Sequence, residues 1–525
     1  MNAATTQLVL QDRLEQVLTN PLAPHAWHRL TAACKDLPIP DRDAVAAQLL
    51  AATPGDGVAG FLRATFLASL TDDTQYLAEA AHLVREITPY NADRAGTFLV
   101  YAWWRFALFG GNDRAEFLER LRAAAFPEIL SLMGAQLDAL ASERPAQREI
   151  TGINKVAVIA PLLSTVEHAP TALALHHAQL LSEQGLSVKI FAPQELQMPR
   201  MQQFVGGGEN FTFNPPPDPN NWKQFTLDRI EVYIGNNQLS LMTRHRNMLR
   251  RMSEFDPDLI FFTGLFSPLL FPLHAVRPVA GLSIHTVPPV GPVDVWLAAD
   301  KTKTETPDLS WSPHIPPPQA VHYPYRIKLR PEDRPFTRAD LRLNSDAIIL
   351  ISVGDSLIAD ISREWAELML DFLANNRNVQ WLLVGGTGEL PAALKDRAPA
   401  QIRTLAHHSG IREICRCCDI FVNPPRMGGG FSVATAMADG LPVVAYAGAD
   451  GGDKIAEYAV ADHAAYFASL AQLAADPELR KKQGAAMQAL FRDTLDLGSA
   501  APALMQACQS ALESYRQRVT IPQSS

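Results

Sequence analysis

The sequence predicts an α/β protein with two domains built on parallel sheets, preceded by an all-helical region. Three observations lead to this prediction. The chain has 525 residues, too many for one hydrophobic core, so two or three domains are expected. Two continuous apolar runs rich in β-branched residues, at 155–162 and 347–355, have the composition of parallel strands buried on both faces. Helical and strand-like segments alternate after each run, which is typical of a Rossmann-like, doubly wound sheet.

The helical region is predicted for residues 1–145. Leu, Ala, Phe and Trp recur there at helical spacing, as in FLRATFLASL and YAWWRFALF. Short breaks such as TPGDG and FGGND separate the helices, and the sequence shows no strand-like alternation. We interpret Trp103 and Trp104 as core residues in preference to a platform for a ligand.

The first α/β domain is predicted for residues 155–335. The strand KVAVIAPL, the helix TALALHHAQLLSEQG and the strand SVKIFAP form a β-α-β unit. DPDLIFFTG and VAGLSIHT supply further strands, and GGGENFTFNPPPDPNN is interpreted as a surface loop or insertion. The apolar stretch at 259–276 contains three interrupting residues, Gly264, Pro268 and Pro272, so we expect a buried strand, a loop and a short helix there.

The second α/β domain is predicted for residues 345–480, and amphipathic helices are predicted for 481–525. The domain begins at AIILISVGD and continues through the helix SREWAELMLDFLANN and the strands VQWLLVGG, CDIFVNP and PVVAYAG. Ligands of parallel sheets bind at the carboxyl ends of the strands. We therefore expect the active site in the cleft between the two α/β domains.

Composition and charge exclude several classes of function. The net charge is -9 and basic residues are not concentrated, so a nucleic-acid partner is not expected. The N-terminus lacks the pattern of a signal peptide, so we expect a cytoplasmic protein without stable membrane insertion. The five cysteines do not form a disulfide framework, and CRCC at 415–418 lacks the spaced pairs of a metal site. We expect packed cysteines, no metal and no cofactor.

The clearest chemical motif is PPRMGGGFSVAT, which lies between a predicted strand and a predicted helix. Gly428, Gly429 and Gly430 remove every Cβ from this turn, so backbone N–H groups can approach an anion at the helix N-terminus. The pattern indicates a diphosphate site, and a tight turn required only for packing is the alternative. The chain has neither G-x-x-x-x-G-K-[ST] nor G-x-G-x-x-G after its first strand, which argues against an ATP-type loop and a dehydrogenase.

The longer stretch NPPRMGGGFSVATAMADGLPVVA resembles the nucleotide-sugar site of GT-B glycosyltransferases. AMADGLPVVA, at 436–445, matches the A-M-A-x-G-x-P-V-V-A of the large retaining family, whereas Met427 and Thr435 replace its two glutamates. The order of parts, with CDIFVNPPRMGGG and RPVAGLSIHTVPPVGPVDVWLAAD, is also similar to that of bacterial cytosolic protein glycosyltransferases. Those enzymes modify adhesins and are related to O-GlcNAc transferases. Their phosphate-binding lysine has no match after Gly354.

The resemblance implies a GT-B fold and a hexosyltransferase that uses a nucleotide sugar, expected to be a UDP-sugar. It implies a protein acceptor, inversion at the sugar and no metal ion. Two alternatives stay open: a glycan or lipid-linked acceptor, and a catalytically inactive GT-B scaffold. The basic run LMTRHRNMLRRM is the one candidate for the membrane-docking patch that a lipid-linked acceptor would require.

Candidate residues follow from these patterns. On the acceptor side, His285 lies after a strand and suits a general base, and Glu167 and His168 occupy the loop after the first strand. Thr435 is expected at the donor ribose, and Arg426 is expected to supply charge for the diphosphate. The complete donor-side set is Ser356, His408, Arg426, Gly428, Gly429, Gly430, Phe431, Ser432, Thr435, Gly451, Gly452 and Lys454.

Overall fold

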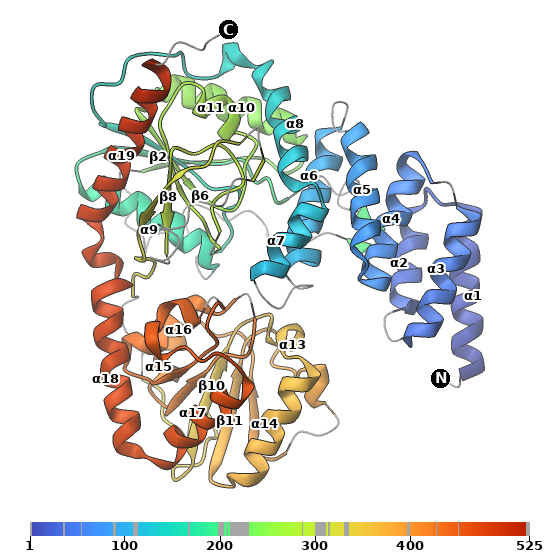
Figure 1. Ribbon diagram of the computed structural model, residues 1–525, viewed down its shortest axis with the longest axis vertical. Coiled ribbons are helices and arrows are strands. Elements are labelled where there is room, and N and C mark those ends of the chain that lie inside the picture. The colour runs from blue at the N-terminus through green and yellow to red at the C-terminus, as the bar shows by residue number, and fades with distance from the viewer. Residues whose placement is uncertain are drawn as a thin grey trace.

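The computed structural model places three bodies of secondary structure along the chain (Figure 1). The residues it describes are 3–34, 37–53, 55–87, 91–108, 114–165, 168–197, 204–206, 208–209, 230–285, 287–299, 311–312, 315–329, 335–395, 399–426, 428–449 and 451–520. The predicted site residue Glu167 lies outside these residues, as do Met427 and most of the predicted loop at 206–221.

The N-terminal body is helical, as predicted. Its helices are α1 (Ala3–Thr19), α2 (Pro24–Cys34), α3 (Ile39–Ala52), α4 (Gly57–Thr71), α5 (Thr74–Ile87), α6 (Ala92–Val100), α7 (Arg114–Ala123), α8 (Phe126–Asp138) and the π-helix η1 (Tyr101–Leu108). Helix α4 is buried on nearly every side because it packs against α2, α3 and α5, and the ring of Phe61 contacts Phe98 of α6. The side chain of Asn91 accepts a hydrogen bond from the backbone N–H of Arg94 and caps α6.

The first α/β body is a parallel sheet of seven strands in the order β5-β2-β1-β6-β7-β8-β9. The strands are β1 (Lys155–Ile159), β2 (Ser187–Ala192), β5 (Glu231–Ile234), β6 (Leu259–Thr263), β7 (Val279–Leu282), β8 (Val295–Ala298) and β9 (Gln319–His322). Helix α9 (Ala169–Glu183) covers one face, and α10 (Leu241–Phe255) and α11 (Leu270–His274) cover the other. The predicted strand, loop and short helix at 259–276 are β6 and α11.

The second α/β body is a parallel sheet of five strands in the order β12-β11-β10-β13-β14. The strands are β10 (Ile348–Val353), β11 (Val379–Val384), β12 (Ile402–Leu405), β13 (Ile420–Val422) and β14 (Val443–Val444). Helices α14 (Arg363–Asn375) and α17 (His463–Ala475) pack on one face, and α15 (Ile411–Cys415), α16 (Gly430–Ala438) and α18 (Pro477–Thr494) pack on the other. Trp365, Trp381 and Tyr466 are fully buried in the first of these layers.

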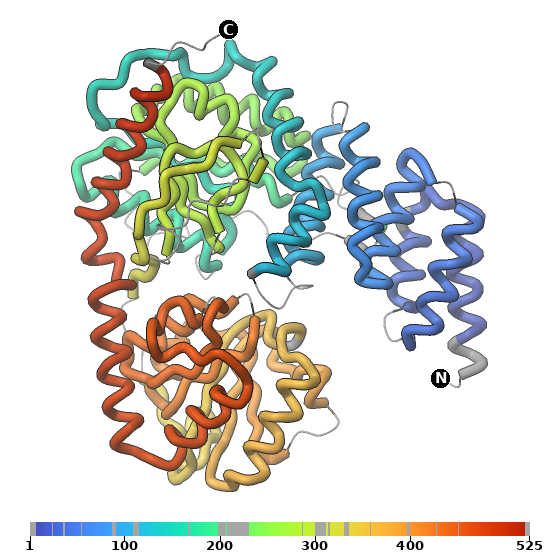
Figure 2. The backbone as a smooth tube through the Cα atoms, in the orientation of Figure 1, coloured from blue at the N-terminus to red at the C-terminus, as the bar shows by residue number. Residues whose placement is uncertain are grey.

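The C-terminal helices connect the two sheets. Helix α18 packs on α16, where Gln488 donates a hydrogen bond to the carbonyl of Ala438 (3.1 Å). After a short turn, α19 (Ala501–Thr520) returns to the first sheet and packs beside β7 and β8. Tyr515 donates a hydrogen bond to the carbonyl of Val276 there (3.0 Å). Figures 1 and 2 show this segment running along both α/β bodies, which fixes the first sheet against the second.

The helical body is joined to the first α/β body by a shared core. Helix α8 packs on α11 and α6 packs on α10. The apolar cluster of the helices continues into Leu162, Leu265 and Phe266, which follow β1 and β6. The end of the helical body nearest this sheet is therefore packed against the carboxyl ends of its strands.

The basic run is the candidate membrane-docking patch of the lipid-linked alternative. In the basic run at 244–252, Arg244 and His245 are buried, and Arg250 and Arg251 pair with Glu143 and Glu254. The run therefore presents few uncompensated positive charges. Within the described ranges, no helix is long and apolar enough to cross a membrane.

Candidate active site between the two sheets

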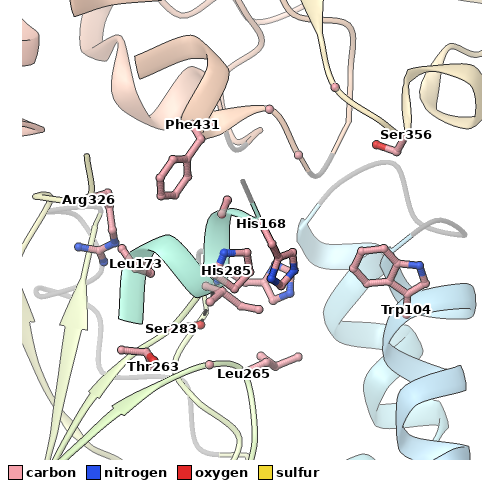
Figure 3. Close-up of a pocket in the computed structure, with 18 of the residues that line it drawn as sticks. Trp104, His168, Leu173, Thr263, Leu265, Ser283, His285, Arg326, Ser356 and Phe431 are labelled. Carbon is pink, nitrogen blue, oxygen red and sulfur yellow. Dashed lines mark hydrogen bonds between the residues drawn. The ribbon is translucent and has the colours of Figure 1, made fainter. Parts of the chain in front are cut away.

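A cavity of about 370 Å³ lies where the carboxyl ends of the two parallel sheets face each other. Its lining comes from loops after β1, β6, β7, β10 and β13 and from the helical body (Figure 3). The lining includes Trp103, Trp104, His168, His285, Arg326, Ser356, Arg426, Gly428, Gly429, Gly430, Phe431, Ser432 and Lys454. This is the cleft position that the sequence predicts for the active site.

The glycine loop leads into α16 and borders the cavity. Gly429 is the N-cap and has φ +95°, a left-handed conformation that favours glycine. A Cβ on Gly429 would lie 2.3 Å from Nη2 of Arg426, whereas a Cβ on Gly428 would meet nothing within 4 Å. The fold therefore requires a glycine at 429, and Gly428 leaves open space in the cavity.

Arg426 holds this loop against the sheet. Its Nε donates to Asn423 Oδ1 (2.9 Å) and its Nη2 donates to the carbonyl of Val353 (2.7 Å). Its Nη1 lies 3.2 Å from Asp360 Oδ2, and both side chains are largely buried. A Cβ on Gly354 would lie 2.3 Å from this guanidinium, so a glycine there makes room for it. Arg426 borders the cavity, but several of its donors are engaged in the loop.

Lys454 brings the second positive charge of the donor side to the cavity. It ends the 3₁₀-helix η6 (Gly452–Lys454), and its Nζ lies 2.8 Å from Oδ1 of Asp453. Ser356, in the loop after β10, donates a hydrogen bond to Asp360 Oδ2 (2.6 Å). Arg426 and Lys454, the two cations of the donor side, are thus both in ion pairs with carboxylates.

Thr435 and His408 are predicted donor-side residues that do not line the cavity. The hydroxyl of Thr435 donates to the carbonyl of Phe431 one turn earlier in α16 (2.9 Å). The Nδ1 of His408 accepts from the N–H of Gly410 (2.8 Å), and its ring packs edge-on against Phe336.

Gly451 and Gly452 also lie outside the lining, next to Asp453 and Lys454. A Cβ on Gly451 would lie 2.7 Å from the side-chain nitrogen of Asn423. A Cβ on Gly452 would lie 1.8 Å from the carbonyl oxygen of Tyr446. These glycines therefore allow the chain to pass close behind the glycine loop.

His168 lies across the cavity at the N-cap of α9. Its Nδ1 is 2.9 Å from the hydroxyl of Thr171, which also accepts from the N–H of Ser164. Burial lowers the pKa of His168 to about 4, so the imidazole is neutral at neutral pH. Such a side chain hydrogen-bonds well but is a weak base.

His285 follows β7, and its backbone N–H donates to Ser283 Oγ (3.1 Å). Its Nε2 accepts a hydrogen bond from the indole N–H of Trp103 (2.9 Å). Trp103 is 3% exposed, as expected of a core residue, whereas Trp104 is partly exposed and lines the cavity. The contact joins residues 182 positions apart, and no sequence pattern points to it.

Arg326 is a cavity residue that the sequence patterns did not single out. It follows β9 and is 7% exposed. Its guanidinium donates to the carbonyls of Leu297 and Tyr325 (3.0 Å each) and lies over the ring of Tyr323. A positive charge is therefore held in the cleft from the first α/β body.

Comparison with known proteins identifies the architecture. The family model described as Glycosyl transferases group 1 matches residues 358–476, which include the glycine loop and Lys454. A structure of an O-GlcNAc transferase mutant from Thermobaculum terrenum matches 98% of this chain and 99% of its own, with a TM-score of 0.54 and 13% identity. The protein has the GT-B glycosyltransferase fold. The fold predicted from the sequence is thereby confirmed.

Two further solved structures match about two thirds of this chain. WaaG, a glycosyltransferase involved in lipopolysaccharide biosynthesis, matches 67% of this chain and 99% of its own, at 13% identity and a TM-score of 0.41. The glycosyltransferase SnogD from Streptomyces nogalater matches 68% and 100%, at 15% identity and a TM-score of 0.38. No curated protein matches in sequence.

Across the ranges that the structure describes, no group of three His, Cys, Asp or Glu side chains has the arrangement of a metal site. Cys415, Cys417 and Cys418 are buried and unpaired by disulfides. Burial raises the pKa of all three thiols, so they are protonated and packed in the core.

Proposed function

We propose that this GT-B protein is a glycosyltransferase that moves a sugar from a nucleotide-sugar donor to an acceptor. One observation carries the proposal. The segment that matches the glycosyltransferase model, 358–476, forms the side of the cavity where the glycine loop leads into α16. Backbone amides at a helix N-terminus favour an anion, and the diphosphate of the donor is the anion that this reaction releases.

The loop amides, the N-terminus of α16 and Lys454 would stabilise the departing diphosphate. Electrostatic stabilisation by fixed protein groups requires no metal ion, and we propose a metal-independent reaction with a UDP-sugar as donor. His168 and His285 face the glycine loop from the opposite side of the cavity (Figure 3). We propose that an acceptor bound on that side attacks the sugar opposite its leaving group, with inversion.

A protein acceptor is the further part of this proposal. The helical body reaches the cavity through Trp103 and Trp104, so an acceptor at the cavity also borders the helices. An extended polypeptide can use such a surface while one side chain enters the cleft. Synthetic peptides and a glycan panel, offered with the donor that binds, would separate protein from glycan acceptors.

The donor site is tested by Gly428→Glu, with Gly428→Ala as the matched control. A side chain at 428 enters open space, so both variants are expected to fold. Like charges about 5 Å apart repel by roughly 3 kcal/mol at an effective dielectric constant of about 20. We therefore expect Gly428→Glu to weaken binding of UDP about 100-fold and Gly428→Ala to leave it nearly unchanged.

The measurements are thermal stabilisation by UDP, GDP and TDP, and release of sugar from a panel of nucleotide sugars with and without EDTA. Binding of none of these ligands to the parent protein would refute the proposal. Equal binding by Gly428→Glu and Gly428→Ala would show that the loop is not the donor site. Loss of turnover on addition of EDTA would refute the metal-independent reaction.

An inactive scaffold is the second candidate, and one observation favours it. Arg426 pairs with Asp360, and Lys454 pairs with Asp453, so carboxylates already offset both donor-side cations. Nucleotide binding without transfer or donor hydrolysis under any condition would support the scaffold over the enzyme.

A further inference from the structure

We propose that Trp103 is a positioning residue for the transfer site, because its indole N–H holds His285 in the Nδ1–H tautomer. In this form the Nε2 lone pair of His285 is engaged by the indole, so His285 does not act as the general base through Nε2. The catalytic consequence rests on the proposed function, whereas the tautomer itself does not.

The indole reaches His285 from an unusual helix. Trp103 lies in the π-helix η1, which continues directly from α6. Wider helical turns of this kind are rare and occur frequently at functional sites. Here the two adjacent indoles take different surroundings: Trp103 is buried against the first α/β body, and Trp104 borders the cavity. Their rings meet edge to face, with centroids 5.3 Å apart.

The imidazole is held firmly in this orientation. The ring centroid of Trp103 lies 5.9 Å from that of His285, with the planes at 71°, and the ring of Phe117 lies 5.2 Å away on another side. Phe266 packs edge to face against Trp103 (6.0 Å). Because Trp103 and Phe117 flank the imidazole, rotation of the ring away from the indole is sterically opposed.

The chemistry of the contact fixes the proton. An indole nitrogen only donates a hydrogen bond, so Nε2 of His285 must accept one. A neutral imidazole that accepts at Nε2 carries its proton on Nδ1. Protonation of Nε2 would set two N–H groups against each other at the same short separation. The contact therefore favours the neutral Nδ1–H form and engages the lone pair that a general base at Nε2 would use.

This assignment changes the role expected of His285. With its Nε2 lone pair engaged by the indole, the imidazole cannot take up the acceptor proton at Nε2 without breaking the contact with Trp103. The helical body thus sets the chemical state of a residue in the cleft. This would give the N-terminal helices a function at the reaction centre, in addition to any contact with an acceptor.

The tautomer is measured on the intact protein by long-range ¹H–¹⁵N correlation spectra with ¹⁵N-labelled histidine. The His285 signals are assigned by their loss in His285→Gln. We expect a protonated Nδ1 and an unprotonated, hydrogen-bonded Nε2 at pH 7. Trp103→Phe keeps an aromatic ring but removes the donor, so Nε2–H should become populated. Trp104→Phe, the adjacent residue of the same type, should leave the His285 signals unchanged.

A parent protein with the proton on Nε2, or spectra that do not change in Trp103→Phe, would overturn the proposal. The parent spectrum is decisive even where Trp103→Phe fails to fold. With a transferase assay, we also expect Trp103→Phe to alter the pH profile of kcat more than the KM for the nucleotide sugar. If no nucleotide binds but the tautomer is as stated, the proposed function fails and the positioning contact stands.

Discussion

Replacement of Gly429 by alanine tests whether backbone geometry fixes the loop that leads into α16. Gly429 has φ +95°, and a left-handed conformation costs a residue with a Cβ about 1–2 kcal/mol. The new methyl group would also lie 2.3 Å from Nη2 of Arg426 and 2.7 Å from Oδ1 of Asn423. Because Arg426 must then move, its contacts with Asn423, Val353 and Asp360 are weakened together.

The magnitude follows from these contacts. Loss of one partner from a buried ion pair typically costs about 3–5 kcal/mol, and here the pair is displaced and not removed. Together with the backbone strain, we expect Gly429→Ala to lower the free energy of unfolding by about 3–5 kcal/mol. Gly428→Ala adds the same methyl group one residue earlier, where nothing lies within 4 Å. This control should change the free energy of unfolding by less than about 0.5 kcal/mol.

The assay is urea denaturation followed by tryptophan fluorescence. Trp365 on α14 and Trp381 on β11 are fully buried in the second α/β body and report on this part of the protein. Binding of UDP by the folded variants gives an independent reading, because a displaced loop should also bind the diphosphate less well. A Gly429→Ala protein as stable as Gly428→Ala would show that the loop does not require a glycine at 429.

Three further predictions concern charge and ionisation. Lys454→Met should weaken UDP binding, measured by calorimetry, about 10- to 100-fold, because a charged hydrogen bond contributes about 1.5–3 kcal/mol. The control Lys482→Met, on α18, should leave UDP binding unchanged. Burial lowers the pKa of His168 from 6.5 to about 4. The unfolded chain therefore binds a proton at this histidine between pH 6.5 and 4, whereas the folded protein does not. The free energy of unfolding should fall as the pH is lowered through this window, and it should fall less steeply in His168→Gln. An equal pH dependence in the two proteins would contradict the burial of His168. Burial raises the pKa of Cys34 to about 11 and of Cys508 to about 12, so a thiol reagent at pH 8 should label the cysteines only after unfolding; rapid labelling of the native protein would contradict this.

Much of the architecture could be predicted because it depends on local patterns. The apolar runs at 155–162 and 347–355 became β1 and β10, since a strand buried on both faces needs apolar residues at every position. Helical spacing of apolar residues identified the N-terminal helices, because residues at this spacing lie on one face of a helix. The three glycines also indicated the loop before α16, because such a turn excludes a Cβ at one of its positions at least.

The roles of individual side chains were not predictable in this way. The sequence suggested Arg426 for the diphosphate, but the fold surrounds its guanidinium with Asp360, Asn423 and the Val353 carbonyl. Thr435 has the expected place along α16, yet its hydroxyl bonds to the helix backbone. The spacing of residues in the sequence indicates which helix or strand a residue belongs to. The partners of its polar atoms, in contrast, come from other elements of the fold.

The sequence by itself therefore determined the two sheets, the preceding helices and the position of the glycine loop. Only the tertiary structure decided which groups meet in the cleft. The clearest case is the hydrogen bond from Trp103 to His285, which joins two bodies of the fold across 182 residues. The physical reason is that hydrophobic periodicity is a property of neighbouring residues, while a hydrogen bond between distant side chains depends on how the packed bodies are placed.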